Sequence, residues 1–372
     1  MKIALIGTRG IPASHGGFET CVEEIGWRLV QKGHKVTVYS KKNPKYGDLK
    51  EYKGMEIVYI PRIPVKGFET LFAALLAVLH TIFLKKQDFH MLFDPANSPT
   101  LLFYKLLGMK CAINVDGLGW QRDKWGKYAK RYYKWSEWAA VKLCKNIVTD
   151  SDAMADYYKK EYRSPSTTIT YGANIPEVDD NEIKPVLANY GLKNHKYILQ
   201  ITRFEPENNP LLTIQAFNKF ESDLMLVLIG GVPSPTSYSE QMEIEGAKNP
   251  AVKLPGFIYD KKVLDIIWTN AFCYIHGNHI GGTNPALLQA MAAARPIIAR
   301  DCIFNREVLD GFGYFYERNV ESLLEQFNII DRNHTDAEKK AKLAFDRVTT
   351  VYTWEQITDQ YEVMFKKLTI IS

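Results

Sequence analysis

Short apolar runs alternate with amphipathic helical segments along almost the whole chain, and this alternation is the feature that most constrains the fold. In the first half, the candidate strands are residues 2–8, 35–40, 56–60, 90–94, 110–117, 146–151 and 167–171. Most of these runs are continuously apolar, as expected for parallel strands that helices cover on both faces. The first half therefore predicts a doubly wound α/β domain.

The same alternation restarts after residues 172–196, a polar, acidic, proline-containing stretch that we interpret as a linker. The candidate strands that follow are residues 197–203, 224–230, 251–257, 272–277 and 296–300. A chain of 372 residues is long enough for two domains. We therefore expect one domain over 1–178, a second over 179–352, and a C-terminal helix in 353–372, for which a return to the first domain is one option.

The composition and a few sequence features limit the classes of protein to which this chain can belong. Hydrophobic residues make up 46% of the chain and charged residues 24%, which is ordinary for a soluble globular protein. The five cysteines are widely spaced without a Cys-x-x-Cys motif, which argues against a zinc site or a disulfide framework and fits a reducing, cytoplasmic compartment. The N-terminus runs directly into a predicted strand rather than a secretory signal. The apolar segment 68–84 is shorter than the ~20 residues of a membrane span, so we expect a buried or interfacial helix.

Parallel sheets bind ligands at the carboxyl ends of their strands, so two such sheets predict a cleft where both sets of ends face each other. At the first strand end, Gly16 and Gly17 open a helix that is expected to run to Lys32. A Gly-Gly pair lets a ligand approach the backbone and leaves N–H groups available, although a tight turn is the alternative. Glu19 falls in the first helical turn, where a carboxylate offsets the helix dipole.

The stretch "GGTNPALLQ" (281–289) predicts an anion site. Gly281, Gly282 and Thr283 form a loop that feeds a helix, with Asn284 as its cap and a proline at its first position. Such a helix N-terminus attracts phosphate groups. Gln289 lies one turn further on and could reach a sugar hydroxyl, or it is an exposed helix glutamine.

Further candidate residues follow other strand ends. Arg203 ends a strand and precedes a helix with Asn209 as its expected cap, which suits a diphosphate or, alternatively, a surface ion pair. Asp116 lies at the mouth of the first sheet, and His276 and His279 lie at the mouth of the second. A structural role is the usual alternative for such histidines.

Metal binding is not favoured by the sequence. Asp150 and Asp152 could hold a divalent cation, but they stand where a strand gives way to a helix, so helix capping is the preferred interpretation. No other metal-ligand cluster is visible. Arg203 and helix N-termini are therefore expected to stabilise a leaving diphosphate without a metal.

Residues 124–145 form the most basic stretch of the chain, with interleaved aromatic residues and one acid, Glu137. This pattern predicts peripheral contact with an anionic membrane surface. The alternative is a solvated helix with some buried rings. Nucleic-acid binding is disfavoured, because the basic residues are confined to this one segment and no recognition motif appears.

The chain resembles the family 4 retaining glycosyltransferases of the GT-B fold, and within them bacterial β-1,4-rhamnosyltransferases of capsule and cell-surface polysaccharide synthesis. The motifs that carry the resemblance are "IGTRGIPASHGGFET", "NVDGLGW", "RFEPENNP", "HGNHIGGTNPALLQAM" and "RDCIFNREVL". The resemblance implies two Rossmann-like domains facing each other across a cleft. It also implies a metal-independent hexosyltransferase without a cofactor, moving L-rhamnose from dTDP-L-rhamnose to a lipid-linked glycan at the inner face of the cell membrane.

The resemblance also implies roles for single residues. Arg203 would bind the donor diphosphate and contribute to catalysis, and Asp116 would contact the transferred sugar and the acceptor. The remaining implied donor-binding residues are Gly16, Gly17, Asn208, His276, Gly281, Gly282, Thr283, Asn284 and Gln289. The remaining implied acceptor-side residues are His15 and Glu19.

Three positions depart from the wider family. Gly281 and Gln289 stand where that family commonly has glutamates, and Asn208 stands where it has a lysine. A carboxylate accepts hydrogen bonds from two vicinal ribose hydroxyls more strongly than an amide does, so Gln289 suits a deoxyribose donor such as dTDP-rhamnose. A UDP- or GDP-sugar donor, a nucleotide-sugar epimerase and a non-catalytic nucleotide-sugar-binding protein stay open as alternatives.

Overall fold

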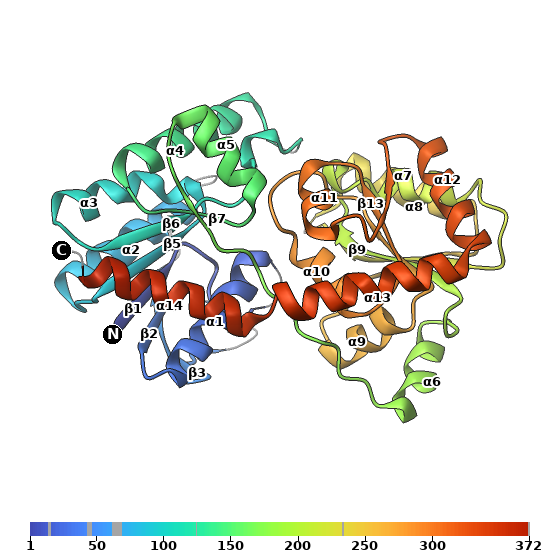
Figure 1. Cartoon of the computed structure of the whole chain (residues 1–372), viewed down its shortest axis with the longest axis horizontal. Coiled ribbons are helices and arrows are strands. Elements are labelled where there is room, and N and C mark those ends of the chain that lie inside the picture. The colour runs from blue at the N-terminus through green and yellow to red at the C-terminus, as the bar shows by residue number, and fades with distance from the viewer. Residues whose placement is uncertain (14–15, 43–46, 62–68, 124, 233, 371–372) are drawn as a thin grey trace. The chain divides into compact units, whose positions relative to one another are not determined.

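The computed structural model describes residues 1–13, 16–42, 47–61, 69–123, 125–232 and 234–370. The chain forms two compact units (Figure 1). The first unit combines Met1–Gly172 with Trp354–Ser372, and the second comprises Ala173–Thr353. The chain therefore passes from the first unit to the second and back again.

A single sheet forms the centre of the first unit, with the order β3-β4-β2-β1-β5-β6-β7-β8 among the described residues. Its strands are β1 (Lys2–Ile6), β2 (Lys35–Lys41), β3 (Glu51–Tyr52), β4 (Met55–Ile60), β5 (Phe89–Phe93), β6 (Cys111–Asn114), β7 (Ile147–Thr149) and β8 (Thr167–Thr168). All neighbours pair in parallel except β3 with β4. Every residue of β5 is buried, including His90, which explains why its sequence does not alternate between apolar and polar residues.

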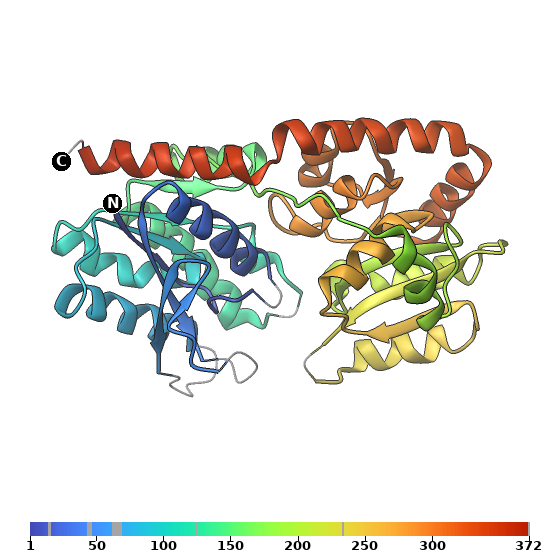
Figure 2. The same ribbon diagram turned by 90° about the horizontal axis from the view of Figure 1, so that it is seen from below.

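Helices cover this sheet. They are α1 (Gly17–Gln31), α2 (Glu69–Phe83), α3 (Leu101–Leu106), α4 (Lys127–Leu143), α5 (Asp152–Tyr162) and α14 (Trp354–Ile370), with 3-10 turns η1 (Pro95–Thr100) and η2 (Gly119–Gln121). The C-terminal helix α14 packs against α1 (Figure 2). The buried Tyr361 hydroxyl accepts a hydrogen bond from Asn114 Nδ2 at 3.2 Å. The rings of Phe89 and Phe365 lie 4.7 Å apart, so α14 completes the core of this unit.

The second unit has a parallel sheet of order β11-β10-β9-β12-β13-β14 among the described residues. Its strands are β9 (Tyr197–Arg203), β10 (Met225–Gly231), β11 (Val252–Gly256), β12 (Cys273–His276), β13 (Ile297–Arg300) and β14 (Tyr314–Tyr316). Its helices are α6 (Asp180–Asn189), α7 (Pro210–Phe217), α8 (Ser237–Gly246), α9 (Lys261–Thr269), α10 (Pro285–Ala292), α11 (Ile303–Leu309), α12 (Val320–Arg332) and α13 (His334–Val351), with the 3-10 turn η3 (Pro206–Asn208). The two predicted doubly wound α/β domains are therefore confirmed.

Some local expectations were wrong. Residues 172–196 are not a linker throughout, because α6 lies within them: Asp179 Oδ1 accepts from Asn181 N at 2.9 Å, and the buried Leu187 lies on the helix, which packs against α9. The predicted strand 110–117 ends at Asn114, because Asp116 enters the left-handed region with φ 53°. The short strands β3 and β14 were missed, since runs of two or three residues carry no periodicity.

Most of the apolar segment 68–84 forms α2, which spans Glu69–Phe83. Phe68 lies outside the described residues. Ala74, Ala77 and Val78 on this helix are fully or almost fully buried. Phe83, at its end, is 76% exposed. Among the described residues, no helix combines the length and the apolarity that crossing a membrane requires.

Replacement of Glu362 in α14 tests how the C-terminal helix is held. Lys366, His34 and Lys32 surround this carboxylate and lower its pKa to about 2, with the Lys366 hydrogen bond as the largest lowering effect. Because the folded pKa lies below the unfolded one, the stabilisation is present above about pH 4.5 and is lost as the pH falls toward 2. Glu362→Gln should therefore lower the free energy of unfolding by about 1 kcal/mol at pH 7 and by progressively less in acid.

Urea unfolding followed by tryptophan fluorescence at several pH values measures this difference. The matched control is Glu355→Gln on the same helix, where the carboxylate is 71% exposed and pairs with Arg28. A surface pair of this kind contributes about 0–1 kcal/mol. An equal loss at pH 7 and pH 3 for Glu362→Gln would contradict the assignment.

Candidate functional site

The carboxyl edge of the second sheet gathers several of the predicted residues. Arg203 is the last residue of β9 and pairs in register with Gly231, the last residue of β10. His276 ends β12, the neighbour of β9 on its other side. Because parallel strands all end at one edge, these three residues come from three adjacent strands at the same side of the sheet.

The loop after β12 leads into α10 as the sequence predicted. Gly281 has φ 101°, a conformation that favours glycine. Asn284 Oδ1 accepts from Ala286 N at 2.9 Å, which is the expected cap, and Pro285 is the first helical residue. Thr283 is only 4% exposed. The start of α10 therefore lies at the carboxyl edge of the sheet, where the positive end of its dipole favours an anion. Pro285 has no N–H, and those of Ala286 and Leu287 bond to Asn284, so the dipole rather than these N–H groups attracts the anion.

His276 is buried at this edge with an unused ring nitrogen. The side chain is 3% exposed, and Nε2 has no hydrogen-bond partner among the described residues. Burial lowers the pKa of His276 to about 3, so the imidazole is neutral at physiological pH. The fully buried Gln200 has an equally unpartnered Oε1 within the described part of the chain, while its Nε2 donates to Asn208 O at 3.1 Å. Such buried polar atoms require a ligand or an ordered water.

The loop that carries Arg203 is held by two asparagines. Asn208 is 4% exposed and donates from Nδ2 to Arg203 O at 2.9 Å, so its side chain shapes the loop. Asn209 does not cap α7 with its side chain as expected. Instead, its Nδ2 donates to Gly277 O at 2.7 Å, and its Oδ1 accepts from Arg318 Nε at 2.9 Å. Asn209 thus fastens the loop after β9 to the end of β12.

Gly277 lies where the backbone after β12 closely approaches the loop after β9. A Cβ atom at this position would lie 2.0 Å from Asn208 O. No side chain fits so near a backbone carbonyl, so glycine is needed here. Beside it, the ring nitrogen Nδ1 of His279 lies 3.1 Å from Glu207 O, which fixes the same loop a second time.

Two aromatic residues that the sequence reasoning missed follow β11. The rings of Phe257 and Tyr259 stack with centroids 5.8 Å apart at an interplanar angle of 14° and are 45% and 57% exposed. A Cβ on Gly231 would lie 2.9 Å from the Phe257 ring, so this ring covers the end of β10. Arg203, Gly231 and Phe257 therefore form a row across three neighbouring strands, spanning about 10 Å. The sequence signal that could have identified these two residues is a pair of aromatic residues directly after a strand.

Gln289 lies on α10, and the nitrogen of its side-chain amide is already hydrogen-bonded within the protein. Its Nε2 donates to Asn174 O at 3.1 Å within the same unit. The carbonyl oxygen Oε1 is therefore the atom that suits a ligand hydroxyl. An amide in this arrangement accepts hydrogen bonds with one oxygen, where a carboxylate would offer two.

In the first unit, the predicted glycine loop precedes α1. Gly16 occupies the N-cap position with φ 111°, and a Cβ there would lie 2.1 Å from Glu19 Oε2. Gly17 begins the helix, as predicted. Glu19 Oε1 accepts from Arg9 N at 3.0 Å, so the carboxylate folds back over the loop. His15 lies outside the described residues.

Asp116 and Asp94 follow the adjacent strands β6 and β5, and both have positive φ values. Asp116 Oδ2 lies 3.6 Å from Arg122 Nη2. Asp94, which the sequence reasoning missed, accepts from Ala96 N at 2.8 Å. Burial is the largest effect on Asp94 and raises its pKa to about 6. The Asp116 and Glu19 carboxylates contribute to this rise, so three acids share this edge.

The helix start near Asp150 and Asp152 is capped, but by the serine between them rather than by either aspartate. Ser151 is the N-cap, and its Oγ accepts from Met154 N at 3.3 Å, while Asp152 lies in the first turn. Within the described ranges, no group of three or more histidine, cysteine, aspartate or glutamate side chains is arranged to hold a metal ion.

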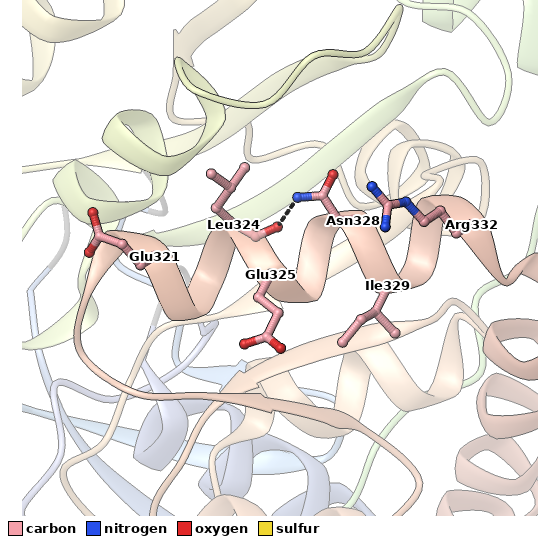
Figure 3. A pocket seen from close by; sticks show the side chains of 6 residues that line it. All are labelled: Glu321, Leu324, Glu325, Asn328, Ile329 and Arg332. Atoms are coloured by element: carbon pink, nitrogen blue, oxygen red, sulfur yellow. Dashed lines mark hydrogen bonds between the residues drawn. The ribbon is translucent and has the colours of Figure 1, made fainter.

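A hollow of about 430 Å³ lies elsewhere, along α12 (Figure 3). Its lining residues are Glu321, Leu324, Glu325, Asn328, Ile329 and Arg332. All six belong to one helix, and none of them is a predicted site residue. This hollow is therefore separate from the row of residues at the carboxyl edge of the second sheet.

Comparison with protein families divides the chain in the same way. Residues 1–174 match a domain of unknown function (DUF1972), and residues 184–344 match the glycosyl transferases group 1 family. No curated protein matches this sequence.

Solved structures resemble the chain over its whole length at low sequence identity. Sucrose-phosphate synthase from Thermosynechococcus elongatus has a TM-score of 0.84 at 18% identity, covering 100% of this chain and 99% of its own. A glycosyltransferase from Rickettsia africae has a TM-score of 0.80 at 15% identity, covering 100% and 99%. HepE from Anabaena, in complex with UDP and glucose, has a TM-score of 0.80 at 13% identity, covering 99% and 100%.

These structural likenesses establish the fold, and the match over residues 184–344 adds the enzyme class. The chain is a glycosyltransferase of the GT-B fold, built from two Rossmann-like α/β domains and carrying a glycosyl transferases group 1 domain.

Proposed function

We propose that the chain is a retaining glycosyltransferase that takes L-rhamnose from dTDP-L-rhamnose and places it on a hydroxyl of a lipid-linked glycan in surface polysaccharide synthesis. Residues 179–352 would bind the donor, and residues 1–178 would serve the acceptor. The observation that carries the proposal is the row of Arg203, Gly231 and Phe257 beside the N-terminus of α10. HepE, which binds UDP-glucose, has the same fold and supports a nucleotide-sugar donor.

Each part of this row suits one part of a nucleoside diphosphate. The Arg203 guanidinium, the loop 281–284 and the positive end of the α10 dipole would hold the diphosphate. The exposed Phe257–Tyr259 stack offers a ring face to the base. The spacing of about 10 Å across two strand intervals matches the separation of these two groups. His276 Nε2 and Gln289 Oε1 would then meet sugar or ribose hydroxyls.

The chemistry follows from where charge develops. When the bond between the sugar and the phosphate breaks, negative charge grows on the diphosphate, and Arg203 with the α10 dipole stabilises it without moving. In a front-face displacement, the departing phosphate oxygen takes the acceptor proton, which retains the anomeric configuration. Asp116, positioned by Arg122 at 3.6 Å, and Glu19 would orient the acceptor. Gly16 and Gly17 would offer backbone N–H groups to the donor.

The identity of the donor base is a separate point. A single amide oxygen on Gln289 suits the one ring hydroxyl of a deoxyribose, which favours a dTDP-sugar. The HepE complex with UDP-glucose favours a UDP-sugar as the second candidate. A thermal-shift screen of dTDP-, UDP- and GDP-sugars distinguishes them, because only a ligand that binds the folded state raises the melting temperature.

The acceptor side is proposed to meet the membrane through residues 124–145, at the inner face of the cell membrane. Residues 127–143 of this segment form α4, and Lys124 lies outside the described residues. A lipid-linked acceptor would be presented at that surface. Product formation from a lipid-linked glycan, with the anomer read by NMR, tests transfer and retention together. Donor epimerised or hydrolysed without an acceptor would instead support the alternative activities.

Substitution of Arg203 tests the diphosphate site. Arg203→Ala should weaken dTDP or UDP binding about 10- to 100-fold, because a charge-assisted bidentate contact is lost. Arg203→Lys should recover only part of this affinity, since an ammonium lacks the planar fork. Isothermal titration calorimetry measures both, with Arg332→Ala on α12 as the control. Wild-type affinity in Arg203→Ala would exclude this residue from the site.

Substitution of Phe257 tests base stacking. Phe257→Ala should weaken binding of dTDP or UDP about 5- to 100-fold, as expected for the loss of one stacked base, whereas Phe257→Trp should preserve it. Inorganic pyrophosphate carries no base, so its affinity should be the same in all three proteins. Competition binding against a fluorescent nucleotide measures both ligands. Equal losses for nucleotide and pyrophosphate would show that the variant had damaged the site as a whole.

Asp94→Asn tests the acidic edge of the first sheet. The pKa of Asp94 is raised to about 6, so its ionisation costs folding energy that is absent below about pH 4 and complete above pH 6. The neutral amide should therefore raise the free energy of unfolding at pH 7.5 by about 1–3 kcal/mol and change it little at pH 4. Urea unfolding measures this, with the exposed Asp123→Asn as control. A gain that did not depend on pH would contradict the assignment.

A further inference from the structure

The exposed face of α4 is basic and aromatic and carries no acid. Its exposed residues recur every three or four positions and are Lys127, Tyr128, Arg131, Trp135, Trp138 and Lys142. The one acid of the helix, Glu137, is 1% exposed and accepts hydrogen bonds from the Tyr157 and Tyr162 hydroxyls at 2.9 and 2.7 Å. The outward stripe of α4 is therefore entirely positive or apolar.

Other aromatic residues of the segment 124–145 turn inward. Tyr132 donates to Ala96 O at 2.7 Å, and the rings of Trp125 and Tyr133 stack 5.7 Å apart. These side chains belong to the packing of the first unit. The sequence pattern alone does not separate them from Trp135 and Trp138, which are each 47% exposed.

The short helix α3 packs beside α4 (Figure 1). Its exposed residues extend this stripe. Lys105 Nζ donates to Lys142 O at 3.1 Å, which joins the C-terminal ends of the two helices. Leu102 is 45% exposed, Leu106 73% and Leu107 54%. Neither α3 nor α4 has an exposed acid, so the exposed leucines of α3 and Trp138 of α4 lie on the same two helices as Lys105 and Lys142.

We propose that this α3–α4 surface docks on an anionic lipid bilayer. Leu106, Leu107 and Trp138 enter the boundary between headgroups and acyl chains, and Lys105 and Lys142 pair with anionic headgroups. Each basic residue near such a surface contributes about 1 kcal/mol. The uniform positive charge selects a bilayer over a second copy of this chain, because two such faces would repel each other.

The inference rests on the proposed function, in which the acceptor is lipid-linked. It adds which surface of the first unit faces the lipid that carries the acceptor. The first turns of α4 pack against η2, the turn that follows Asp116. A helix of 17 residues spans about 25 Å. Lipid docked along α4 therefore reaches from the Lys105–Lys142 junction to the edge where Asp116 and Asp94 lie.

The test is co-sedimentation of the full chain with vesicles of phosphatidylcholine, with and without phosphatidylglycerol. The wild-type chain should pellet only with the anionic vesicles, and less so in high salt. Leu106→Ser combined with Trp138→Ser, and separately Lys105→Glu combined with Lys142→Glu, should each weaken vesicle binding at least about tenfold. The matched control is Ile244→Ser combined with Lys262→Glu, which changes an isoleucine that is 65% exposed and an exposed lysine in the second unit.

Binding of dTDP and UDP to each protein is measured in parallel, so that misfolding and the two proposals are separated. Lost vesicle binding with unchanged nucleotide affinity supports the docking surface. Wild-type failure to pellet, or pelleting of both α3–α4 variants at wild-type levels, would overturn it. A dimer in light scattering that the leucine and tryptophan changes abolish, without vesicle binding, would identify a second copy as the occupant and also overturn it. Vesicle binding without nucleotide binding would count against the proposed function alone.

Discussion

Parallel pairing of β9, β10 and β12 is the constraint on which the candidate donor site depends. It brings the ends of three strands to one edge of the sheet. Beyond that edge, the backbone N–H and C=O groups have no partner in a neighbouring strand and must bond elsewhere. The Asn209 side chain supplies such bonds. Its Nδ2 donates to Gly277 O, at the end of β12, and its Oδ1 accepts from Arg318 Nε, which ties down the loop after β9. The geometry around Arg203 is thus set by the side-chain hydrogen bonds of Asn208 and of Asn209, the residue at the N-cap position of α7.

The buried polar groups at the same edge differ in whether the fold itself satisfies them. Asn208 and the Nε2 atom of Gln200 are used internally, whereas His276 Nε2 and Gln200 Oε1 have no partner among the described residues. Buried atoms of this kind reduce stability unless something binds to them. A ligand hydroxyl that donated to Gln200 Oε1 would recover the corresponding energy.

Sequence reasoning succeeded where a feature is local. The alternation of strands and helices, the start of α1 at Gly17 and the cap at Asn284 all follow from neighbouring residues, and the structure confirms them. It failed where distant residues decide. Asp94 acquires its raised pKa from burial and from acids on other segments. Phe257 ends a predicted strand, and its ring covers the end of β10 because Gly231, which is distant in sequence, has no side chain in that place.

The path of the chain has a consequence for how the protein is made. The first unit lacks α14 until residues 354–372 have been synthesised, because the second unit lies between them in sequence. During translation, Asn114 and Phe89, which contact Tyr361 and Phe365 in the finished fold, stay uncovered on the α1 side of the first sheet. All residues of the second unit are synthesised before α14. The N-terminal unit is therefore the last to be completed, and a fragment that ends near Gly172 is a sheet without its final helix.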